Sequence, residues 1–224
     1  MADLDTDAHH GFAAGLGDKL DAGVRSGLLR DLHAVVVRRA GRTVLERYYA
    51  GPDEAWDEQL GVTAFGPEVL HDVRSISKTV VGLLYGIALQ RGLVPPPAAG
   101  LLAQFPEYAD LAADPARRRI CVRHALNMTM GLAWNEWLPY TDPANSERAM
   151  GRAADFKRYV LEQPVVAAPG VKWTYSGGAV ALLGSLIERG AGMPLARFAA
   201  QALFQPLGIE RFEWTARADG TALA

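Results

Sequence analysis

The chain reads HDVRSISKTVVGLLYGIALQRG from His71 to Gly92. Residues 80–89 are apolar on every face of a helix, which is typical of a helix buried on all sides rather than of an amphipathic surface helix. Arg91 in the last turn and Gly92 just beyond it are common signals of a helix end. The sequence therefore predicts a central buried helix that ends at about Gly92.

Ser75 and Lys78 stand at the start of this helix, three residues apart and so on one face of it. An amine at the mouth of a buried helix is costly unless it is paired or neutral. The chain has 19 arginines but only four lysines, and an amine, unlike a guanidinium, can lose its proton. A base of this kind activates a serine hydroxyl as a nucleophile, and a helix N-terminus stabilises an oxyanion.

An ordinary structural role explains the same two residues. Serine is a common helix N-cap, and a lysine in the first turn can extend its amine to solvent. With six serines and four lysines in 224 residues, a Ser-x-x-Lys arises by chance roughly one time in ten. The pair alone leaves catalysis and capping equally open.

Composition limits the class of protein. A chain of 224 residues with 50% hydrophobic and 21% charged residues is globular, as one domain or two closely packed ones. A net charge of −2 predicts no nucleic-acid partner, and the single Cys121 forms no intramolecular disulfide. No stretch reaches the about 18 apolar residues of a membrane span, and residues 1–10 do not read as a signal peptide. We therefore expect a cytoplasmic protein without a membrane segment.

The segments before the central helix predict an α/β arrangement. Residues 12–28 predict an amphipathic helix, and residues 35–37 and 44–49 predict a β-hairpin. Residues 51–68 are polar and marked by proline and glycine, which predicts a loop.

A mostly helical region is predicted to follow. Residues 120–131 read as a second buried helix capped by Gly131. Residues 132–145 form a long loop whose aromatic residues, Trp134, Trp137 and Tyr140, either line a pocket or fill the core. Further helices are predicted over residues 155–161, 179–189 and 194–204.

Other chemistries are excluded by inspection. None of the six serines has glycines at both −2 and +2, as the nucleophile elbow of an α/β-hydrolase requires. The chain also contains no His-Glu-x-x-His, Cys pair, phosphate loop or Gly-x-Gly-x-x-Gly. The sequence therefore predicts no metal and no cofactor.

Four motifs in order resemble the serine β-lactamase and penicillin-binding-protein superfamily. They are SISK at 75–78, LNMTMGL at 126–132, PGVKWTYSG at 169–177 and FQPLG at 204–208. The chain is most similar to the esterase and 6-aminohexanoate-dimer-hydrolase branch, next to class C β-lactamases, from about residue 32 to 214. The resemblance implies that Ser75 is the acylated nucleophile, Lys78 its proton acceptor, and Tyr175 the residue that passes a proton to the leaving group.

Two departures from the family pattern bear on the substrate. The family's second motif is usually Tyr-x-Asn, whereas Gly177 stands at the Asn position here. No Lys/His-Thr/Ser-Gly third motif follows Tyr175; in the family that motif lies on a strand that donates the second oxyanion N–H. The chain therefore resembles the front portion of such a hydrolase, and Gly177 favours esters or linear amides over β-lactams.

The resemblance also implies the fold. We expect an α/β (α+β) protein in which helices flank an antiparallel sheet, with a mostly helical subdomain and with the C-terminal strands absent from this chain. Residues 1–70 would form the N-terminal helix and hairpin of the α/β part. Residues 71–204 would form the nucleophile helix and the helical subdomain, and residues 205–224 would begin the return to the α/β part.

The expected function is a serine hydrolase that cleaves small esters or linear amides through an acyl-enzyme on Ser75. Trp134, Trp137 and Tyr140 would supply an apolar acyl pocket, with Gly177 beside the substrate. The alternative is a non-catalytic or incomplete chain that binds a ligand or partner without turnover. An open sheet edge would then allow self-association.

Overall fold

The computed structural model describes residues 11–12, 14–55 and 58–217. Residues 1–10, for which the sequence predicts no signal peptide, and residues 218–224 of the predicted third segment lie outside that part. The chain divides into two compact units, residues 1–72 (the N-terminal unit) and residues 73–224 (the helical unit). Helices and antiparallel strands are combined in one chain, which confirms the predicted mixed fold class.

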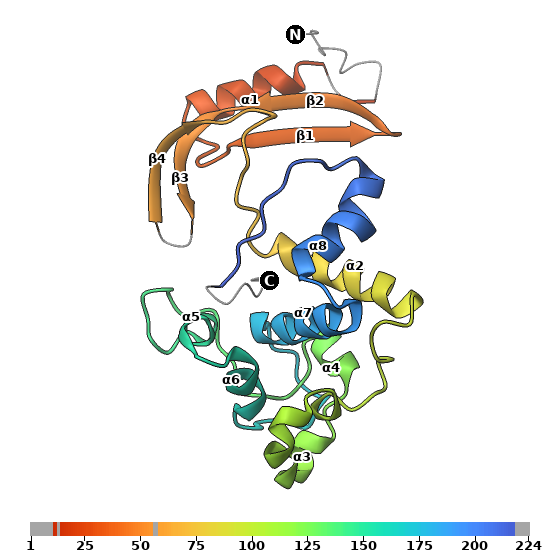
Figure 1. The fold of residues 1–224 in the computed structure, drawn as a ribbon. Helices are drawn as coiled ribbons and strands as arrows, with labels where there is room; N and C mark the ends of the chain where they lie inside the picture. The colour runs from red at the N-terminus through yellow and green to blue at the C-terminus, as the bar shows by residue number, and fades with distance from the viewer. Residues whose placement is uncertain (1–10, 13, 56–57, 218–224) are drawn as a thin grey trace. The chain divides into compact units, whose positions relative to one another are not determined.

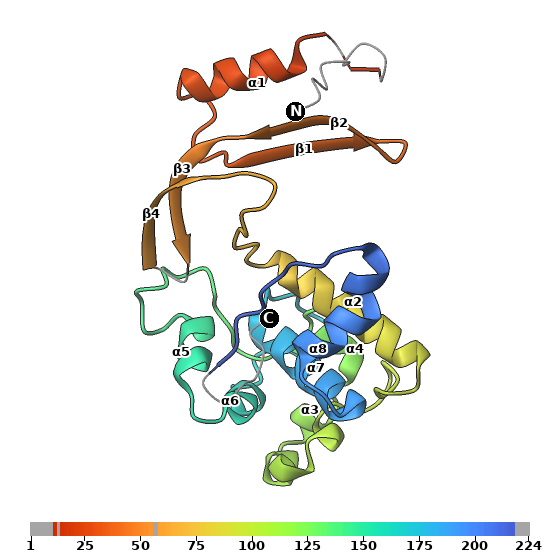
Figure 2. The ribbon, with the colours of Figure 1, turned by 45° about the horizontal axis from the view of Figure 1, so that its top comes forward.

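The N-terminal unit holds one helix and two hairpins (Figure 1). Its elements are α1 (Leu16–Arg25), β1 (Ala34–Arg39), β2 (Arg42–Tyr48), β3 (Ala50–Ala55) and β4 (Glu58–Ala64). Helix α1 lies along the β1–β2 hairpin in both ribbon views (Figures 1 and 2), and the Tyr49 hydroxyl donates to Asp21 of α1 at 2.8 Å. The predicted helix and first hairpin are therefore confirmed, the helix being shorter than residues 12–28.

The predicted loop over residues 51–68 is wrong, because most of it forms a second antiparallel hairpin. Strands β3 and β4 pair with Pro52 opposite Val62 and with a bulge at Asp53 and Glu54. Leu60 and Val62 are 54% and 80% exposed. Because neither face of β4 is buried, its sequence lacks the alternation of apolar and polar residues from which strands are predicted.

The helical unit is built from seven α-helices and short 3₁₀ and π turns among the described residues. The helices are α2 (Ile76–Gln90), α3 (Pro115–Arg118), α4 (Val122–Leu126), α5 (Ser146–Arg152), α6 (Phe156–Glu162), α7 (Gly177–Ala191) and α8 (Leu195–Ala199). The 3₁₀ turns are Leu102–Gln104, Pro106–Ala113 and Gln205–Leu207, and the π turn is Ala200–Phe204.

The core of this unit forms where α2 packs against α7 (Figure 1). The central helix is therefore confirmed, but its burial on all sides is not. Its residues Leu84 and Tyr85 are buried, whereas Ile76 and Leu83 are 63% and 54% exposed. The cause is that α7 covers one side of α2 only, so an all-round apolar sequence does not prove all-round burial within this unit.

The helix predicted over residues 120–131 is also too long. Helix α4 ends at Leu126, after which Met128 takes a φ of +57° and Gly131 a φ of +78°. Gly131 does not cap the helix; it lies in an extended loop, where a Cβ atom would collide with the carbonyl oxygen of Ala167. This glycine therefore serves a close backbone approach rather than a helix end.

Replacing Gly131 by alanine is expected to destabilise the protein. The left-handed backbone alone costs an alanine about 1–3 kcal/mol, and the Ala167 carbonyl must also move. Urea unfolding measures the change, and Gly151→Ala is the matched control because its Cβ would meet no atom within 4 Å. Equal midpoints for the two variants would contradict this account of Gly131.

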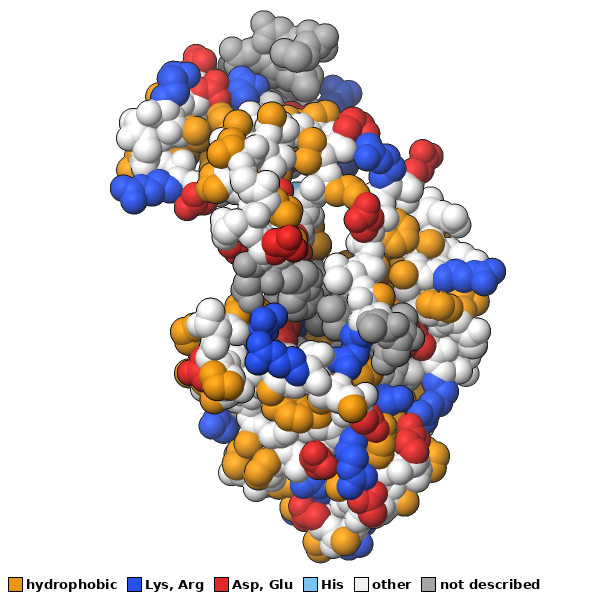
Figure 3. All heavy atoms as spheres, turned by 60° about the vertical axis from the view of Figure 1, so that its left-hand side comes forward, with side chains coloured by type: hydrophobic (Ala, Val, Ile, Leu, Met, Phe, Trp, Pro, Cys, Tyr) orange, Lys and Arg blue, Asp and Glu red, His pale blue; other side chains and the backbone are white. Residues whose placement is uncertain are grey.

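The surface of the helical unit mixes both signs of charge. On the face drawn in the lower part of Figure 3, Lys and Arg side chains lie among Asp and Glu side chains rather than in a continuous basic area. Arg158, for example, pairs with Asp110 at 2.8 Å and with Glu162 at 3.3 Å. Among the described residues, no helix has the length and apolar character needed to cross a membrane.

Candidate active site

The predicted nucleophile lies at the start of α2, and it does not act as a helix cap. Ser75 is the N-cap residue of α2, yet its hydroxyl makes no capping hydrogen bond. Its oxygen instead accepts a hydrogen bond from Lys78 Nζ at 3.2 Å. The capping role that was an alternative explanation of Ser75 is therefore not seen.

Lys78 is withdrawn from solvent, which rules out the other structural explanation. Its side chain is only 8% exposed, and its amine lies 3.5 Å from Glu147 Oε1 and 5.5 Å from the centroid of the Tyr175 ring. The structure thus brings Tyr175, which is far away in the sequence, close to Ser75 and Lys78. An amine, a hydroxyl and a phenol within one cluster are the groups that acyl transfer to serine needs.

The backbone just before Ser75 is held in an unusual conformation. Arg74 has a φ of +47°, which costs a non-glycine residue about 1–3 kcal/mol unless its surroundings compensate. The backbone N–H groups of Ile76, Ser77 and Lys78 are used in tight turns at the start of the helix. The N–H of Ser75 has no acceptor within the described residues, so it is available to an oxyanion.

Two carboxylates that the sequence did not single out complete the cluster. Glu136 Oε1 accepts a hydrogen bond from the Trp134 indole at 2.6 Å and another from the Gly177 N–H. Glu147 Oε2 accepts one from the Tyr140 hydroxyl at 2.7 Å, while its Oε1 faces Lys78. These contacts gather both acids beside the first turn of α7.

Burial and a neighbouring carboxylate make Glu136 costly to ionise. Burial raises the pKa of Glu136, and the nearby charge of Glu147 raises it further, against the opposing effects of the Gly177 N–H, the Trp134 indole and Lys78. Burial and the bond to Glu147 also raise the pKa of Tyr140, so that its hydroxyl remains a donor. Hydrogen bonds within the cluster therefore hold Glu136 and Tyr140 in place.

Asn145 fixes the position of Glu147. This side chain is fully buried and caps α5, accepting hydrogen bonds from the N–H groups of Glu147 at 3.0 Å and Arg148 at 3.1 Å. Its amide also donates to the carbonyl of Leu138 at 2.7 Å, which ties the loop to the helix. A cap before an acidic residue in a first turn is a signal that sequence reasoning could have used.

Replacing Asn145 by alanine is expected to destabilise the protein by about 1–3 kcal/mol, because a cap is lost and a buried carbonyl loses its partner. Asp155→Ala is a stringent comparison, since Asp155 caps α6 at the surface and also accepts a hydrogen bond from the Tyr108 hydroxyl. Denaturant midpoints measure both. A loss smaller for Asn145→Ala than for Asp155→Ala would contradict the central place given to Asn145.

The predicted aromatic residues divide into two kinds. Trp134 and Tyr140 use their polar ends to hold Glu136 and Glu147. Trp137 is 78% exposed, and its ring centroid lies 5.8 Å from that of Tyr175. Trp173, which the sequence analysis did not consider, is also exposed and lies 6.2 Å from Tyr175.

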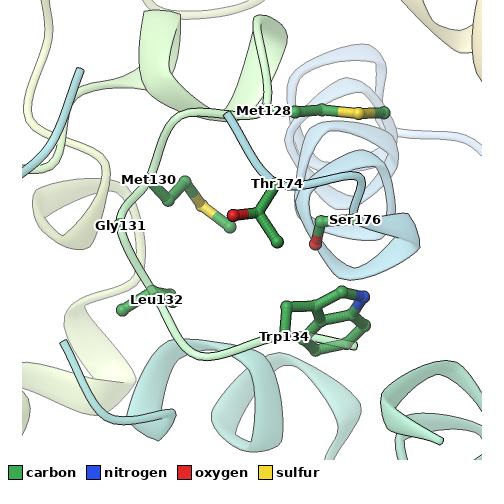
Figure 4. Close-up of a pocket in the computed structure, with 7 residues that line it drawn as sticks. All are labelled: Met128, Met130, Gly131, Leu132, Trp134, Thr174 and Ser176. Carbon is green, nitrogen blue, oxygen red and sulfur yellow. The ribbon is translucent and has the colours of Figure 1, made fainter. Parts of the chain in front are cut away.

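A pocket lies between residues 128–134 and residues 174–176 (Figure 4). It is lined by Met128, Met130, Gly131, Leu132, Trp134, Thr174 and Ser176. The segments are joined by a hydrogen bond from the Thr174 N–H to the Met128 carbonyl at 2.9 Å. Figure 4 shows the side chains of Met130, Thr174 and Trp134 facing a common space. The hydrogen bond between Thr174 and Met128 therefore places Tyr175 beside the loop that carries Glu136.

The fold is that of a serine β-lactamase-like protein. Residues 24–222 match the Beta-lactamase family, and the chain belongs to that family. It is 28% identical over 221 residues to Esterase EstB from Burkholderia gladioli, a match that covers 93% of this chain and 54% of EstB.

Solved structures share the fold. A putative 6-aminohexanoate-dimer hydrolase from Bacillus anthracis superposes with a TM-score of 0.66 at 15% identity, covering 95% of this chain and 52% of that one. EstCE1, described as a hydrolase with promiscuous acyltransferase activity, gives 0.64 at 21% identity, covering 90% and 53%. The predicted resemblance to the esterase and dimer-hydrolase branch is confirmed, and the chain spans about half the length of these relatives.

Proposed function

We propose that the protein is a serine hydrolase that cleaves small esters or linear amides through an acyl-enzyme on Ser75. The observation that carries the proposal is the 3.2 Å contact between Lys78 Nζ and Ser75 Oγ at the start of α2. Lys78 is shielded from solvent and faces both Glu147 and Tyr175. Neither residue serves the structural role that would otherwise explain it.

Acylation follows from these positions. Ser75 Oγ attacks the carbonyl carbon of the substrate, and its proton passes to the Lys78 amine in its neutral form. The Ser75 N–H and the N-terminus of α2 stabilise the negative oxygen. As the bond to the alcohol or amine breaks, the Tyr175 hydroxyl gives that group a proton and takes one from Lys78.

Deacylation reverses the roles. A water molecule attacks the carbonyl carbon of the acyl-Ser75 ester, and its proton returns to Ser75 Oγ through Tyr175 and Lys78. The products are the free acid and the original enzyme. No cofactor or metal takes part in this sequence of steps.

Esters are the preferred substrate class in this proposal. Gly177 offers no side-chain amide to a β-lactam, and the exposed rings of Trp137 and Trp173 flank Tyr175, where they can contact an apolar acyl or alcohol group. The similarity to an esterase supports the same choice.

The test is turnover of a short-chain nitrophenyl ester against turnover of a chromogenic cephalosporin. We expect a higher kcat/KM for the ester, with an initial burst of nitrophenol if the acyl-enzyme accumulates. Faster turnover of the cephalosporin would refute the ester preference. Binding of the ester without any release of nitrophenol would instead support the non-catalytic alternative.

A further inference from the structure

Gly177 leaves a space that two acidic side chains occupy. A Cβ atom at this position would lie 2.9 Å from Glu136 Oε1 and 2.9 Å from Glu147 Oε1, closer than real Cβ contacts come. It would also lie 3.5 Å from Lys78 Cε. The glycine is thus the point where α7, the acids and the predicted base meet, and any side chain there would displace the acids.

Glu147 is the acid that reaches the base. Its side chain is 10% exposed and that of Lys78 is 8% exposed, so this ion pair is shielded from water and from salt. The order of groups is Glu147 Oε1, then Lys78 Nζ at 3.5 Å, then Ser75 Oγ at 3.2 Å. A carboxylate on one side of the amine and the nucleophile on the other fix where the amine lies.

The other groups around Lys78 leave this role to Glu147. Glu136 accepts hydrogen bonds from the Trp134 indole and the Gly177 N–H, and burial raises its pKa. Tyr175 offers its ring to the amine, and Tyr140 donates to the far oxygen of Glu147. The guanidinium of Arg74 lies 5.9 Å from the centroid of the Tyr140 ring.

We propose that Glu147 is a positioning residue for the hydrolase: seated in the space that Gly177 leaves, its carboxylate holds the Lys78 amine against Ser75. This inference rests on the proposed function. Glu147 touches neither substrate nor the reacting atoms in this account. It acts through Lys78, whose amine it holds.

The first test is Glu147→Gln in the whole protein. The amide is close in shape but carries no charge, so the amine is held less firmly. We expect kcat/KM for the ester to fall on the order of 10²-fold, because the base is misplaced. The loss should lie in kcat rather than in KM, because Glu147 acts on Lys78 and not on the substrate.

A second readout does not depend on turnover. The chain has only four lysines, so their side-chain NMR signals can be separated, and Lys78→Arg identifies that of Lys78. The chemical shifts of the Lys78 side chain should change in Glu147→Gln, because the carboxylate beside the amine is lost. If the wild type does not hydrolyse esters, the proposed function fails, while these NMR signals still decide whether Glu147 holds Lys78.

The matched control is Glu162→Gln. Glu162 pairs with Arg158 at 3.3 Å on the surface of α6, so its loss should leave both the rate and the Lys78 signals unchanged. If Glu147→Gln fails to fold, Glu147→Asp replaces it. The aspartate keeps the charge but withdraws it by one methylene, so kcat should fall by less than in Glu147→Gln.

The space at Gly177 gives a separate test. Gly177→Ala should reduce activity because its Cβ displaces the acids, and combining it with Glu147→Ala should give less than the product of the two losses. Independent, multiplicative losses would overturn the shared use of this space. A Glu147→Gln variant whose kcat, KM and Lys78 NMR signals all match the wild type would overturn the positioning role.

Discussion

Replacing Ser75 by alanine is expected to abolish ester hydrolysis while leaving the fold intact. Loss of a serine nucleophile costs at least about 10⁴-fold in kcat, since the remaining groups cannot form an acyl-enzyme. Stability should change by less than about 1 kcal/mol, because the Ser75 hydroxyl makes no capping hydrogen bond. Ester turnover and a thermal melt of the same preparation measure the two effects.

Ser77→Ala is the control for this experiment. Ser77 lies on the same turn and its hydroxyl donates to the Arg74 carbonyl at 2.8 Å, outside the cluster around Lys78. Its removal should leave turnover within a few-fold of the wild type. Hydrolysis by Ser75→Ala at the wild-type rate, or an equal loss in Ser77→Ala, would contradict the assignment of the nucleophile.

Replacing Lys78 by arginine is expected to be nearly as damaging, within about 10-fold of Ser75→Ala. The guanidinium keeps the positive charge facing Glu147, but it stays protonated at any working pH and cannot accept the serine proton. Because Lys78→Arg keeps the positive charge, a loss of activity in this variant indicates that Lys78 acts as a base and not only as a structural cation. The pH dependence of kcat/KM from about pH 6 to pH 10 measures this difference.

Lys172→Arg is the matched control, because Lys172 is exposed and its substitution keeps charge at a distance from the cluster. It should match the wild type in rate and in pH profile. A Lys78→Arg variant with an unchanged profile would show that Lys78 does not act as the base.

The central helix and the Ser75–Lys78 pair could be predicted because both are local features. Three residues of spacing on a helix place two side chains on one face, and an apolar run with end signals marks the helix itself. The Lys78 contact with Ser75 needs no information from the rest of the chain. Tyr175 depended on the family resemblance, since its place beside Lys78 is set by the hydrogen bond between Thr174 and Met128.

Glu136 and Glu147 could not be predicted in the same way. They lie on a loop and at the next helix start, and the buried amide of Asn145 brings them to Gly177. From the sequence, Gly177 indicates only that an amide side chain is absent. The structure shows that Glu136 and Glu147 fill the space beside Gly177. What occupies the space beside a glycine can be learned only from the structure, because those neighbours come from distant parts of the sequence.

The errors in the fold have a common cause. The β3–β4 hairpin is not predicted because β4 buries neither face and β3 is only half-buried on one, and the predicted α4 is too long because a glycine such as Gly131 is a common helix cap. In both cases backbone hydrogen bonds and residues with a positive φ set the conformation, and neither leaves an apolar pattern in the sequence. The periodicity of apolar residues is the main evidence for secondary structure that a sequence provides.

The most direct test of the account is covalent labelling with a fluorophosphonate, which modifies activated serines, followed by intact mass and peptide mapping. We expect one adduct, carried by the peptide that contains Ser75, with labelling abolished in Ser75→Ala and strongly slowed in Lys78→Arg. Ser77 lies in the same peptide, so fragmentation must place the adduct on Ser75 itself. An unmodified wild-type protein, or an adduct on any other residue, would contradict the claim that Ser75 is an activated nucleophile.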